Sequence, residues 1–466
     1  MENKKLKDGI VLILIANILN MVFSIGTNFL LPKYVSVDTY AQIKTYQLIL
    51  SYAAILQLGF SDGMFLSFGG RDINEISLVE LQTSVSTMRA FQAVVALISI
   101  GIAILIGDPV LIVAAIAVLP QNVIAYYKNL FQAVGIFDKY SKIMNYTTGL
   151  TFAINIILLF FVRSDNYLYY IIGYTALNVF LSVLLEYSIH SLKGVSYSVK
   201  YFSWKELIEK VKDGISLLFA NFSSILLTSM DRWFTKVLMT TVDFAQYSFA
   251  VSIENFLNVA VTPITVTLYN YFCNNYEKEK VDRIRDLIIG FSTLLVSVAF
   301  PIKYIIELFL EKYTDSIRVL FLLFAAQIFL IVVRSVYANL YKARKRQNTY
   351  FIKMCIVIVL GLIFNYVCYL VYPHKEAFAI GTLLSSIVWL ILSLNDFKDI
   401  PVKWTRILFL GVQTVAFIVC GELSAIIGFF IYILVILVTL KMFIPNVMKE
   451  YIAMVKAGLR KVRIIK

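Results

Sequence analysis

The chain is poor in charge, cysteine and histidine, and each shortage excludes a class of protein. Only 15% of its 466 residues are Asp, Glu, Lys or Arg, whereas soluble proteins contain about 25%, so we expect no soluble domain of useful size. The four cysteines form no CxxC pair, and there are only two histidines. This supply is too small and too scattered for a metal or redox site, so we expect no metal and no cofactor.

Hydrophobic residues fill the chain instead. They make up 60% of it, and the mean hydropathy is +0.80. Apolar runs recur at about 20 residues, the length that crosses a bilayer as a helix. We predict an all-α polytopic membrane protein with about 14 transmembrane helices, or 12 if the weak pairs at Asp108-Pro109 and Gly421-Glu422 are merged. The predicted spans are 9–31, 41–68, 85–106, 109–133, 144–162, 166–189, 214–238, 243–272, 285–306, 316–341, 350–372, 376–395, 405–420 and 423–443.

The residues that give the formal charge of +13 lie mainly in the loops between the predicted spans. Basic clusters fall on alternate loops and on the tail, and the opposite loops are short and carry few cations. This alternation predicts that both termini are cytoplasmic, with attraction to membrane lipids of negative charge as a by-product. We expect no nucleic-acid partner, because no basic, aromatic-interleaved soluble module exists to bind one.

Polar stripes occur twice, about 205 residues apart. Each is spaced i, i+3, i+7, i+10 and so follows one helix face. The first consists of Asn17, Asn20, Ser24 and Thr27, and the second of Asn221, Ser224, Thr228 and Asp231. A second match aligns 126–144 with 336–354 without gaps. A polar stripe in a membrane helix needs a partner or a water-filled cavity, so duplicated stripes favour a transporter with a cavity between its halves.

The duplication predicts two parallel six-helix lobes around a central cavity, related by an axis along the membrane normal. Additional segments connect the lobes and follow the second one. The predicted organisation is a first lobe at 1–190, a cytoplasmic amphipathic linker at 191–213, a second lobe at 214–395, an extra helix pair at 396–443 and a basic cytoplasmic tail at 444–466.

Two segments resemble a known family. They are NFLLPKYVSVDTYAQIKTYQLILSYAAILQLGFSDGMFLSFGG (28–70) and LLTSMDRWFTKVLMTTVDFAQYSFAVSI (226–253). The first resembles the opening hairpin, and the second the seventh-helix signature, of the Wzx-type polysaccharide flippases of the multidrug/oligosaccharidyl-lipid/polysaccharide (MOP) exporter superfamily. A loop position often filled by Gly in that family is Ala41 and Ala245 here.

The resemblance implies a flippase, not an enzyme, in the bacterial cytoplasmic (inner) membrane. Such proteins move undecaprenyl-pyrophosphate-linked oligosaccharide units to the outer leaflet by alternating access of two lobes. The units become O-antigen, capsule or related glycans, so a polysaccharide polymerase and a chain-length regulator are the implied partners.

Four basic residues are candidates for contacting the pyrophosphate of such a cargo. Arg binds phosphate through paired hydrogen bonds, and a charge inside a span is costly unless it has a function. The candidates are Arg232, Arg334, Arg89 and Lys44. For Arg232 the alternative is an internal ion pair with Asp231, and for Arg334 it is a side chain that reaches the inner interface.

Acidic and amide residues complete the predicted site. Asp231 is expected to orient Arg232, whereas Glu254 and Asp62 are candidates for taking up a coupling proton or cation. The stripe residues Asn17, Asn20, Asn221 and Ser224 are candidates for binding sugar hydroxyls, with helix-to-helix hydrogen bonding as the alternative role.

Two other functions remain open from the sequence. A drug or cation exporter of the same superfamily needs buried acids more than bases, and the intramembrane charge here is mixed. A membrane glycan polymerase or lipid-linked glycosyltransferase needs a sizeable external loop with catalytic groups, but the predicted external loops are about ten residues long. His374 is the only histidine expected outside.

Overall fold

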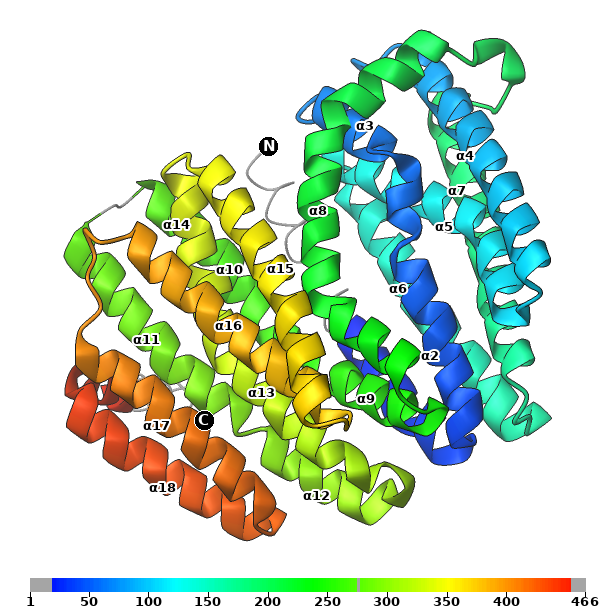
Figure 1. Cartoon of the computed structure of the whole chain (residues 1–466). Coiled ribbons are helices and arrows are strands. Elements are labelled where there is room, and N and C mark those ends of the chain that lie inside the picture. The colour runs from blue at the N-terminus through cyan, green and yellow to red at the C-terminus, as the bar shows by residue number, and fades with distance from the viewer. Residues whose placement is uncertain (1–18, 275–276, 454–466) are drawn as a thin grey trace, which may run out of the picture. The chain divides into compact units, whose positions relative to one another are not determined.

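The computed structural model describes residues 19–274 and 277–453 (Figure 1), except for the side chains of 270, 273 and 274. Within these residues every regular element is helical. The chain divides into two compact units, which we call the N-terminal unit (Met1–Ser229) and the C-terminal unit (Met230–Lys466). The division falls inside one long helix, α8 (Trp204–Leu238).

The N-terminal unit begins with a helical stretch at 19–34. Its further elements are α2 (Val37–Ser51), the 3₁₀ turn η1 (Ala53–Gln57), α3 (Phe60–Phe68), α4 (Leu78–Ile106), α5 (Pro109–Ala133), α6 (Phe137–Ile156), the π-helical η2 (Ile157–Val162), α7 (Tyr167–Lys193), the 3₁₀ turn η3 (Val199–Tyr201) and the first part of α8.

The C-terminal unit continues from the end of α8. Its elements are α9 (Thr241–Glu254), α10 (Leu257–Asn274), α11 (Lys278–Val296), α12 (Ala299–Phe309), the 3₁₀ turn η4 (Glu311–Ser316), α13 (Ile317–Val332), the π-helical η5 (Val333–Tyr337), α14 (Ala338–Ala343), α15 (Gln347–Val371), α16 (Glu376–Asp396), α17 (Trp404–Glu422) and α18 (Ala425–Phe443). The last two pack side by side and along α12 and α13 (Figure 1).

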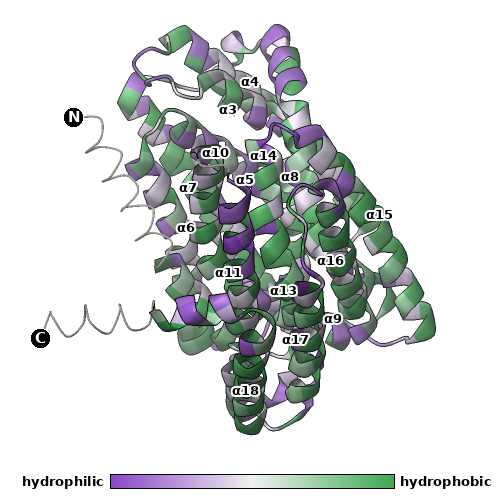
Figure 2. Cartoon of the chain, turned by 90° about the vertical axis from the view of Figure 1, so that its left-hand side faces the viewer, coloured by the Kyte–Doolittle hydropathy of each residue, from purple (hydrophilic) through white to green (hydrophobic). Residues whose placement is uncertain are grey.

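The predicted all-α polytopic fold is confirmed. Among the described residues, 11 helices are long and apolar enough to span a membrane, and two bent helix pairs raise the number to 13. These 13 correspond to all the predicted spans except 9–31, which lies partly outside the described residues. Figure 2 shows α15 and α18 as almost continuously hydrophobic. The chain is therefore a multi-pass membrane protein.

Both pairs of closely spaced spans are separate helices, so neither pair merges into a single span. Asp108 lies between α4 and α5 and is the N-cap of α5. Its carboxylate accepts a hydrogen bond from the Val110 N–H at 2.8 Å. Caps of this kind satisfy a donor that has no partner inside the helix. Leu423 and Ser424 separate α17 from α18.

The second and eighth spans differ from the prediction, because each is broken. The second bends by 61° between η1 and α3, where Leu58 (φ 50°) and Gly59 (φ 86°) are left-handed. The eighth bends by 42° between α9 and α10, before Pro263, which lies inside α10. The seventh helix also starts earlier than predicted, since α8 takes up residues 204–213 of the predicted linker.

Amide side chains from other spans fill the break in the second span. Asn122 of α5 donates to the Ala53 carbonyl at 3.1 Å and to Gln92 at 2.7 Å. Gln92 of α4 in turn donates to the Leu56 carbonyl at 3.2 Å, and Gln57 donates to Asn122 at 3.1 Å. A broken helix leaves carbonyls without partners, and no water reaches them inside a bilayer. These amides therefore make the break stable.

Replacing Asn122 with alanine is expected to destabilise the N-terminal unit by about 1–3 kcal/mol, because it leaves the buried Ala53 carbonyl without its partner. The measurement is the thermal unfolding midpoint of the purified protein in detergent. Gln121→Ala is the control, since Gln121 is the neighbouring half-buried amide and forms no hydrogen bond with a described residue. Equal midpoints for the two variants would show that the network does not support the break.

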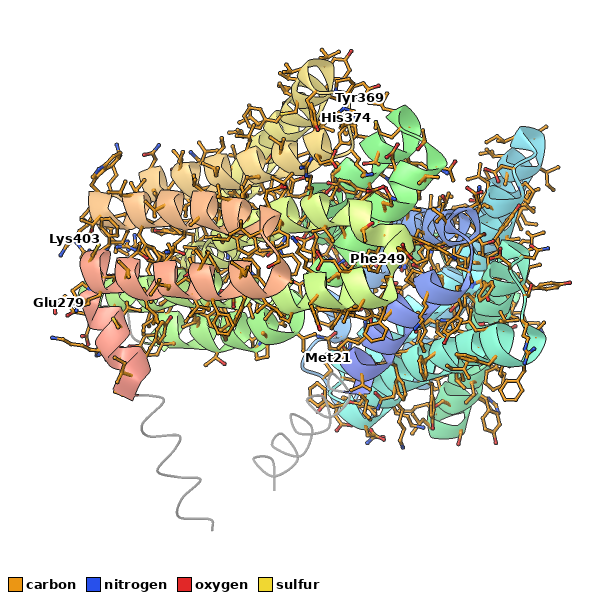
Figure 3. The ribbon with its side chains drawn as sticks, turned by 90° about the horizontal axis from the view of Figure 1, so that it is seen from below. Met21, Phe249, Glu279, Tyr369, His374 and Lys403 are labelled. Atoms are coloured by element: carbon orange, nitrogen blue, oxygen red, sulfur yellow. The ribbon has the colours of Figure 1, made fainter. Side chains whose placement is uncertain are left out.

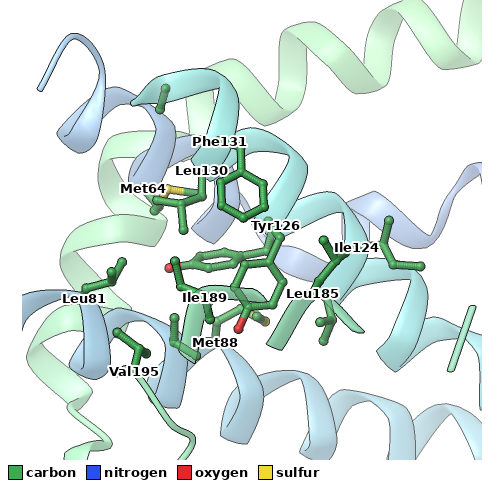
Figure 4. Close-up of a cluster of buried hydrophobic side chains, with 14 of the residues drawn as sticks. Met64, Leu81, Met88, Ile124, Tyr126, Leu130, Phe131, Leu185, Ile189 and Val195 are labelled. Atoms are coloured by element: carbon green, nitrogen blue, oxygen red, sulfur yellow. The ribbon is translucent and has the colours of Figure 1, made fainter. Parts of the chain in front are cut away.

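A hydrophobic cluster and a glycine crossing hold the N-terminal unit together at the α3 end. The cluster joins α3, α4, α5 and α7 through side chains such as Met64, Leu81 and Tyr126 (Figure 4). Next to it, α8 crosses α3 at close range. A Cβ atom at Gly63 would lie 2.7 Å from the Lys210 carbonyl carbon, and one at Gly214 would overlap the backbone of α3. The crossing therefore needs glycine on both helices.

Ion pairs fasten the start of α17 to α11, and the loop before α17 to the end of α14, in the C-terminal unit. Arg406 forms three hydrogen bonds with Asp286, the shortest at 2.5 Å. Arg344 holds Asp399 through two hydrogen bonds of 2.6 and 3.1 Å, which lower the pKa of the Asp399 carboxyl below its usual value. Figure 3 shows Glu279 and Lys403 at this end of the unit, with Tyr369 and His374 well away from them.

Candidate functional site: an intramembrane charge cluster

Four of the predicted site residues lie close together in the C-terminal unit. Asp231 follows the unit boundary in α8, and its carboxylate is 4% exposed. It accepts hydrogen bonds from the Tyr247 hydroxyl at 2.7 Å and from the Thr382 hydroxyl at 3.4 Å. It also accepts one from the Arg232 N–H at 2.8 Å. The carboxylate therefore ties α8 to α9 and α16 inside the membrane-spanning part of this unit.

Glu254 lies at the break of the eighth span, at the last residue of α9. Its carboxylate accepts a hydrogen bond from the Gln327 side chain of α13. Electrostatic interactions connect it with Asp231, Arg232 and Arg334. The helix break thus places the Glu254 carboxylate near Asp231, Arg232 and Arg334. The break of the second span is likewise occupied by polar side chains.

The two arginines of this cluster keep unused hydrogen-bond donors. Arg334 sits on the π-helical turn η5, inside the span 311–343. Its guanidinium forms no hydrogen bond and no salt bridge with any described residue, although it interacts electrostatically with Glu254. The Nε of Arg232 is buried and has no acceptor. A π-helical turn inside an α-helix is frequent at functional sites, because it re-aims the side chains.

We call Asp231, Arg232, Glu254 and Arg334 the charge cluster. Burying a charge inside a membrane is expensive unless another group compensates it. Two acids and two bases balance in formal charge, yet the guanidinium groups retain free donors. An arrangement of this kind can bind an anion at the guanidinium groups, and its acids can bind a cation or a proton.

The remaining basic candidates are partnered within the N-terminal unit. Lys44 donates to the Asn28 side chain at 3.2 Å, and Asn28 donates to the Ser24 carbonyl at 3.0 Å. Lys44 therefore meets the first polar stripe. Arg89 of α4 forms a 2.6 Å salt bridge with Glu186 of α7, so its guanidinium group is paired inside this unit.

Asp62 and the second stripe also meet in the N-terminal unit. The Asn221 amide of α8 donates to the Asp62 carboxylate of α3 at 3.2 Å. Asn221 and Ser224 are exposed, and Asn20 is half-buried with a side-chain oxygen that lacks a partner. Asn17 lies outside the described residues. The structure thus places the predicted site residues in separate groups, and the charge cluster is the largest.

Sequence reasoning missed the uncharged groups that hold the charge cluster, namely Tyr247, Thr382 and Gln327. Gln327 had a usable signal, because it interrupts the apolar run FLLFAAQIFLIVV (321–333), and an amide in such a run needs a partner. Tyr247 lies in the segment that carries the family resemblance. Thr382 had no signal, since a hydroxyl can bond to its own helix. Among the described residues no group of three or more His, Cys, Asp or Glu is arranged to hold a metal.

Comparison with known proteins relates this chain to solved transporters by fold. No protein-family model and no curated protein matches the sequence. The lipid II flippase MurJ, in an inward closed conformation, superposes with a TM-score of 0.68 at 14% identity, covering 94% of this chain and 100% of that one. A multidrug-resistance MATE family transporter of the MOP superfamily gives 0.61 at 13% identity over 83% and 95%. A mutant of the Vibrio cholerae MATE transporter VcmN gives 0.53 at 15% identity over 85% and 97%.

This chain shares their fold. The likeness extends over nearly the whole of both chains, but an identity of 13–15% makes it a likeness of architecture. These solved neighbours are a flippase and transporters.

Proposed function

We propose that this protein is a flippase of the Wzx type, which moves undecaprenyl-pyrophosphate-linked oligosaccharide units across the bacterial inner membrane by alternating access. The units would serve the synthesis of O-antigen, capsule or a related glycan, with both termini of the protein in the cytoplasm. A glycan polymerase and a chain-length regulator are the partners that this function requires.

The observation that carries the proposal is the pair of guanidinium groups with free donors, Arg232 and Arg334, inside the membrane spans. A pyrophosphate carries several negative charges and oxygen acceptors in a compact group. Arg binds such groups with paired, charge-assisted hydrogen bonds of short length. The negative charge of Glu254 compensates the positive charge of Arg334 when no cargo is bound. An incoming pyrophosphate would compete with this carboxylate for Arg334.

A drug or cation exporter is the second candidate, and the acids of the same cluster favour it. The Asp231 and Glu254 carboxylates lie within membrane spans and carry the charge that an organic cation needs. The fold does not separate the two functions, because flippase and drug transporters are both among the neighbours. The unused donors are what distinguish them, since a cation has no use for a free guanidinium.

Deletion of the gene tests the proposal directly. A flippase is expected to leave lipid-linked oligosaccharide accumulated inside the deletion strain and to remove the corresponding glycan from the cell surface, with drug sensitivity unchanged. Both phenotypes should revert when the gene is restored. Normal surface glycan together with raised sensitivity to cationic drugs would contradict the flippase function and support the drug-exporter function.

A further inference from the structure

A cavity of about 550 Å³ lies within the C-terminal unit, away from the charge cluster, where the ends of α12, α13, α16 and α17 meet. The loops at this end are those with few basic residues, opposite the loops that carry the Lys and Arg clusters. By the charge rule, this end faces outward. The residues used below are Lys303, Glu307, Arg318, Tyr372, Glu376 and Glu422, all of which line the cavity.

Two cations of the cavity, Lys303 and Arg318, are held in different ways. The ammonium group of Lys303 donates to the Gly421 carbonyl at 2.8 Å and to the Leu423 carbonyl at 2.6 Å, and its side chain is only 8% exposed. Arg318 forms a 3.2 Å salt bridge with Glu422, and both side chains are more than half exposed. Lys303 therefore belongs to the wall, whereas the Arg318–Glu422 pair lies open to a ligand.

Carboxylate acceptors remain free beside these cations. Glu376 accepts no hydrogen bond from any described residue, although it interacts electrostatically with Arg318. Glu307 has only the distant Lys303 ammonium at 3.7 Å, and its side chain is 40% exposed. The cavity lining thus combines cationic donors with carboxylate acceptors, and no sign of charge dominates it.

An aromatic ring stands beside these polar groups. The Tyr372 side chain is 42% exposed, and its ring lies edge-to-face with the His374 ring at 4.5 Å between centroids. This contact packs one part of the ring, and the exposed part remains open to a ligand. A fixed, half-exposed ring offers an apolar surface for the C–H face of a flat ligand.

The chemistry of the cavity fits a polyhydroxylated ligand better than an ion. The lining holds four carboxylates, those of Glu307, Asp315, Glu376 and Glu422, and three bases, Lys303, Arg318 and Lys375. A phosphate would meet the carboxylates and an organic cation would meet the bases, whereas a hydroxyl both donates and accepts. The volume is within the range of small-molecule sites and suits roughly one or two sugar rings. We propose that this cavity binds a saccharide at the outer face of the protein. The proposal rests on the proposed function, since the glycan of the translocated lipid is the saccharide that reaches this face.

Binding of the free glycan tests this proposal. The probe is the oligosaccharide released by mild acid from the lipid-linked pool of the deletion strain, titrated calorimetrically into full-length protein in lipid nanodiscs. Glu376→Gln and Tyr372→Ala are each expected to raise the Kd tenfold or more. Glu311→Gln and Tyr304→Ala are matched controls, because Glu311 and Tyr304 are exposed residues nearby that do not line the cavity. Both controls should bind as the wild type does.

The outcomes separate the two proposals. Equal affinity in Glu376→Gln and Glu311→Gln, or no binding of the released oligosaccharide, overturns the saccharide site alone if the lipid-linked pool accumulates. A deletion strain without such a pool overturns the flippase function and the saccharide site together. A thermal midpoint within the error of the wild type for each variant confirms that the comparison is between folded proteins.

Discussion

Replacing Arg334 with alanine is expected to lower glycan export roughly ten- to hundredfold, because hydrogen bonds to charged groups contribute about 1.5–3 kcal/mol and each 1.4 kcal/mol is tenfold. The guanidinium group has no hydrogen-bond partner among the described residues, so its loss breaks no bond of the fold. Arg232→Ala is expected to act in the same direction. The measurement is surface glycan per cell, normalised to the amount of protein in the membrane.

Three further variants sharpen this prediction. Arg334→Lys keeps the charge but loses the paired geometry, so export should fall between wild type and Arg334→Ala. Arg283→Ala is the control, because the Arg283 side chain is 67% exposed and pairs only with Glu450 at the basic end. The double variant of Arg232 and Arg334 should export no glycan. Wild-type export in both single alanine variants, at normal expression, would remove the phosphate role.

Replacing Gly63 with alanine is expected to destabilise the N-terminal unit by about 3 kcal/mol, the upper end for overpacking. The added Cβ would lie 2.7 Å from the carbonyl carbon and 2.9 Å from the Cα of Lys210. Backbone atoms cannot turn away as a side chain can, so α3 and α8 must move apart. The thermal midpoint should fall by about 6–12 °C, at about 2–4 °C per kcal/mol for a unit of this size.

Gly101→Ala is the matched control for the crossing. Gly101 is also a helical glycine, but a Cβ there meets no atom within 4 Å. The substitution should leave the midpoint unchanged or raise it slightly, since alanine is worth about 0.5–1 kcal/mol over glycine in a helix. Gly214→Ala should repeat the loss seen at Gly63. Similar midpoints at positions 63 and 101 would mean that the two helices do not need close contact.

The spans could be predicted because each one is recognisable from its own sequence, as an apolar run. An apolar run of bilayer length has one stable form in lipid, a helix that satisfies its own backbone. The predicted ends of α16 and α18 lie within two residues of the observed ends for this reason. The breaks in the second and eighth spans had no such signal. In the sequence, the Leu58-Gly59 turn is a single glycine in an apolar run, and the hydrogen bonds of Asn122 and Gln92 from other spans stabilise the break.

The charged members of the site could also be predicted, and the uncharged ones could not. The charged members can be recognised because they interrupt apolar runs, where burying a charge is costly unless it is paired or functional. They are Asp231, Arg232, Glu254 and Arg334. Whether they meet was beyond the sequence. Their proximity depends on the bend after Glu254 and on the π-helical turn at Arg334, which re-aim side chains by amounts that spacing does not reveal.

The sequence by itself determined that this is an all-helical, multi-pass membrane protein, where its spans lie and which charges are buried in them. It did so because hydropathy and the cost of a buried charge are properties of each segment alone. Only the tertiary structure decided where the helices break, which residues join the charge cluster and that a mixed-charge cavity forms among α12, α13, α16 and α17. Those features arise from hydrogen bonds and contacts between segments far apart in the chain, whose geometry no single segment encodes.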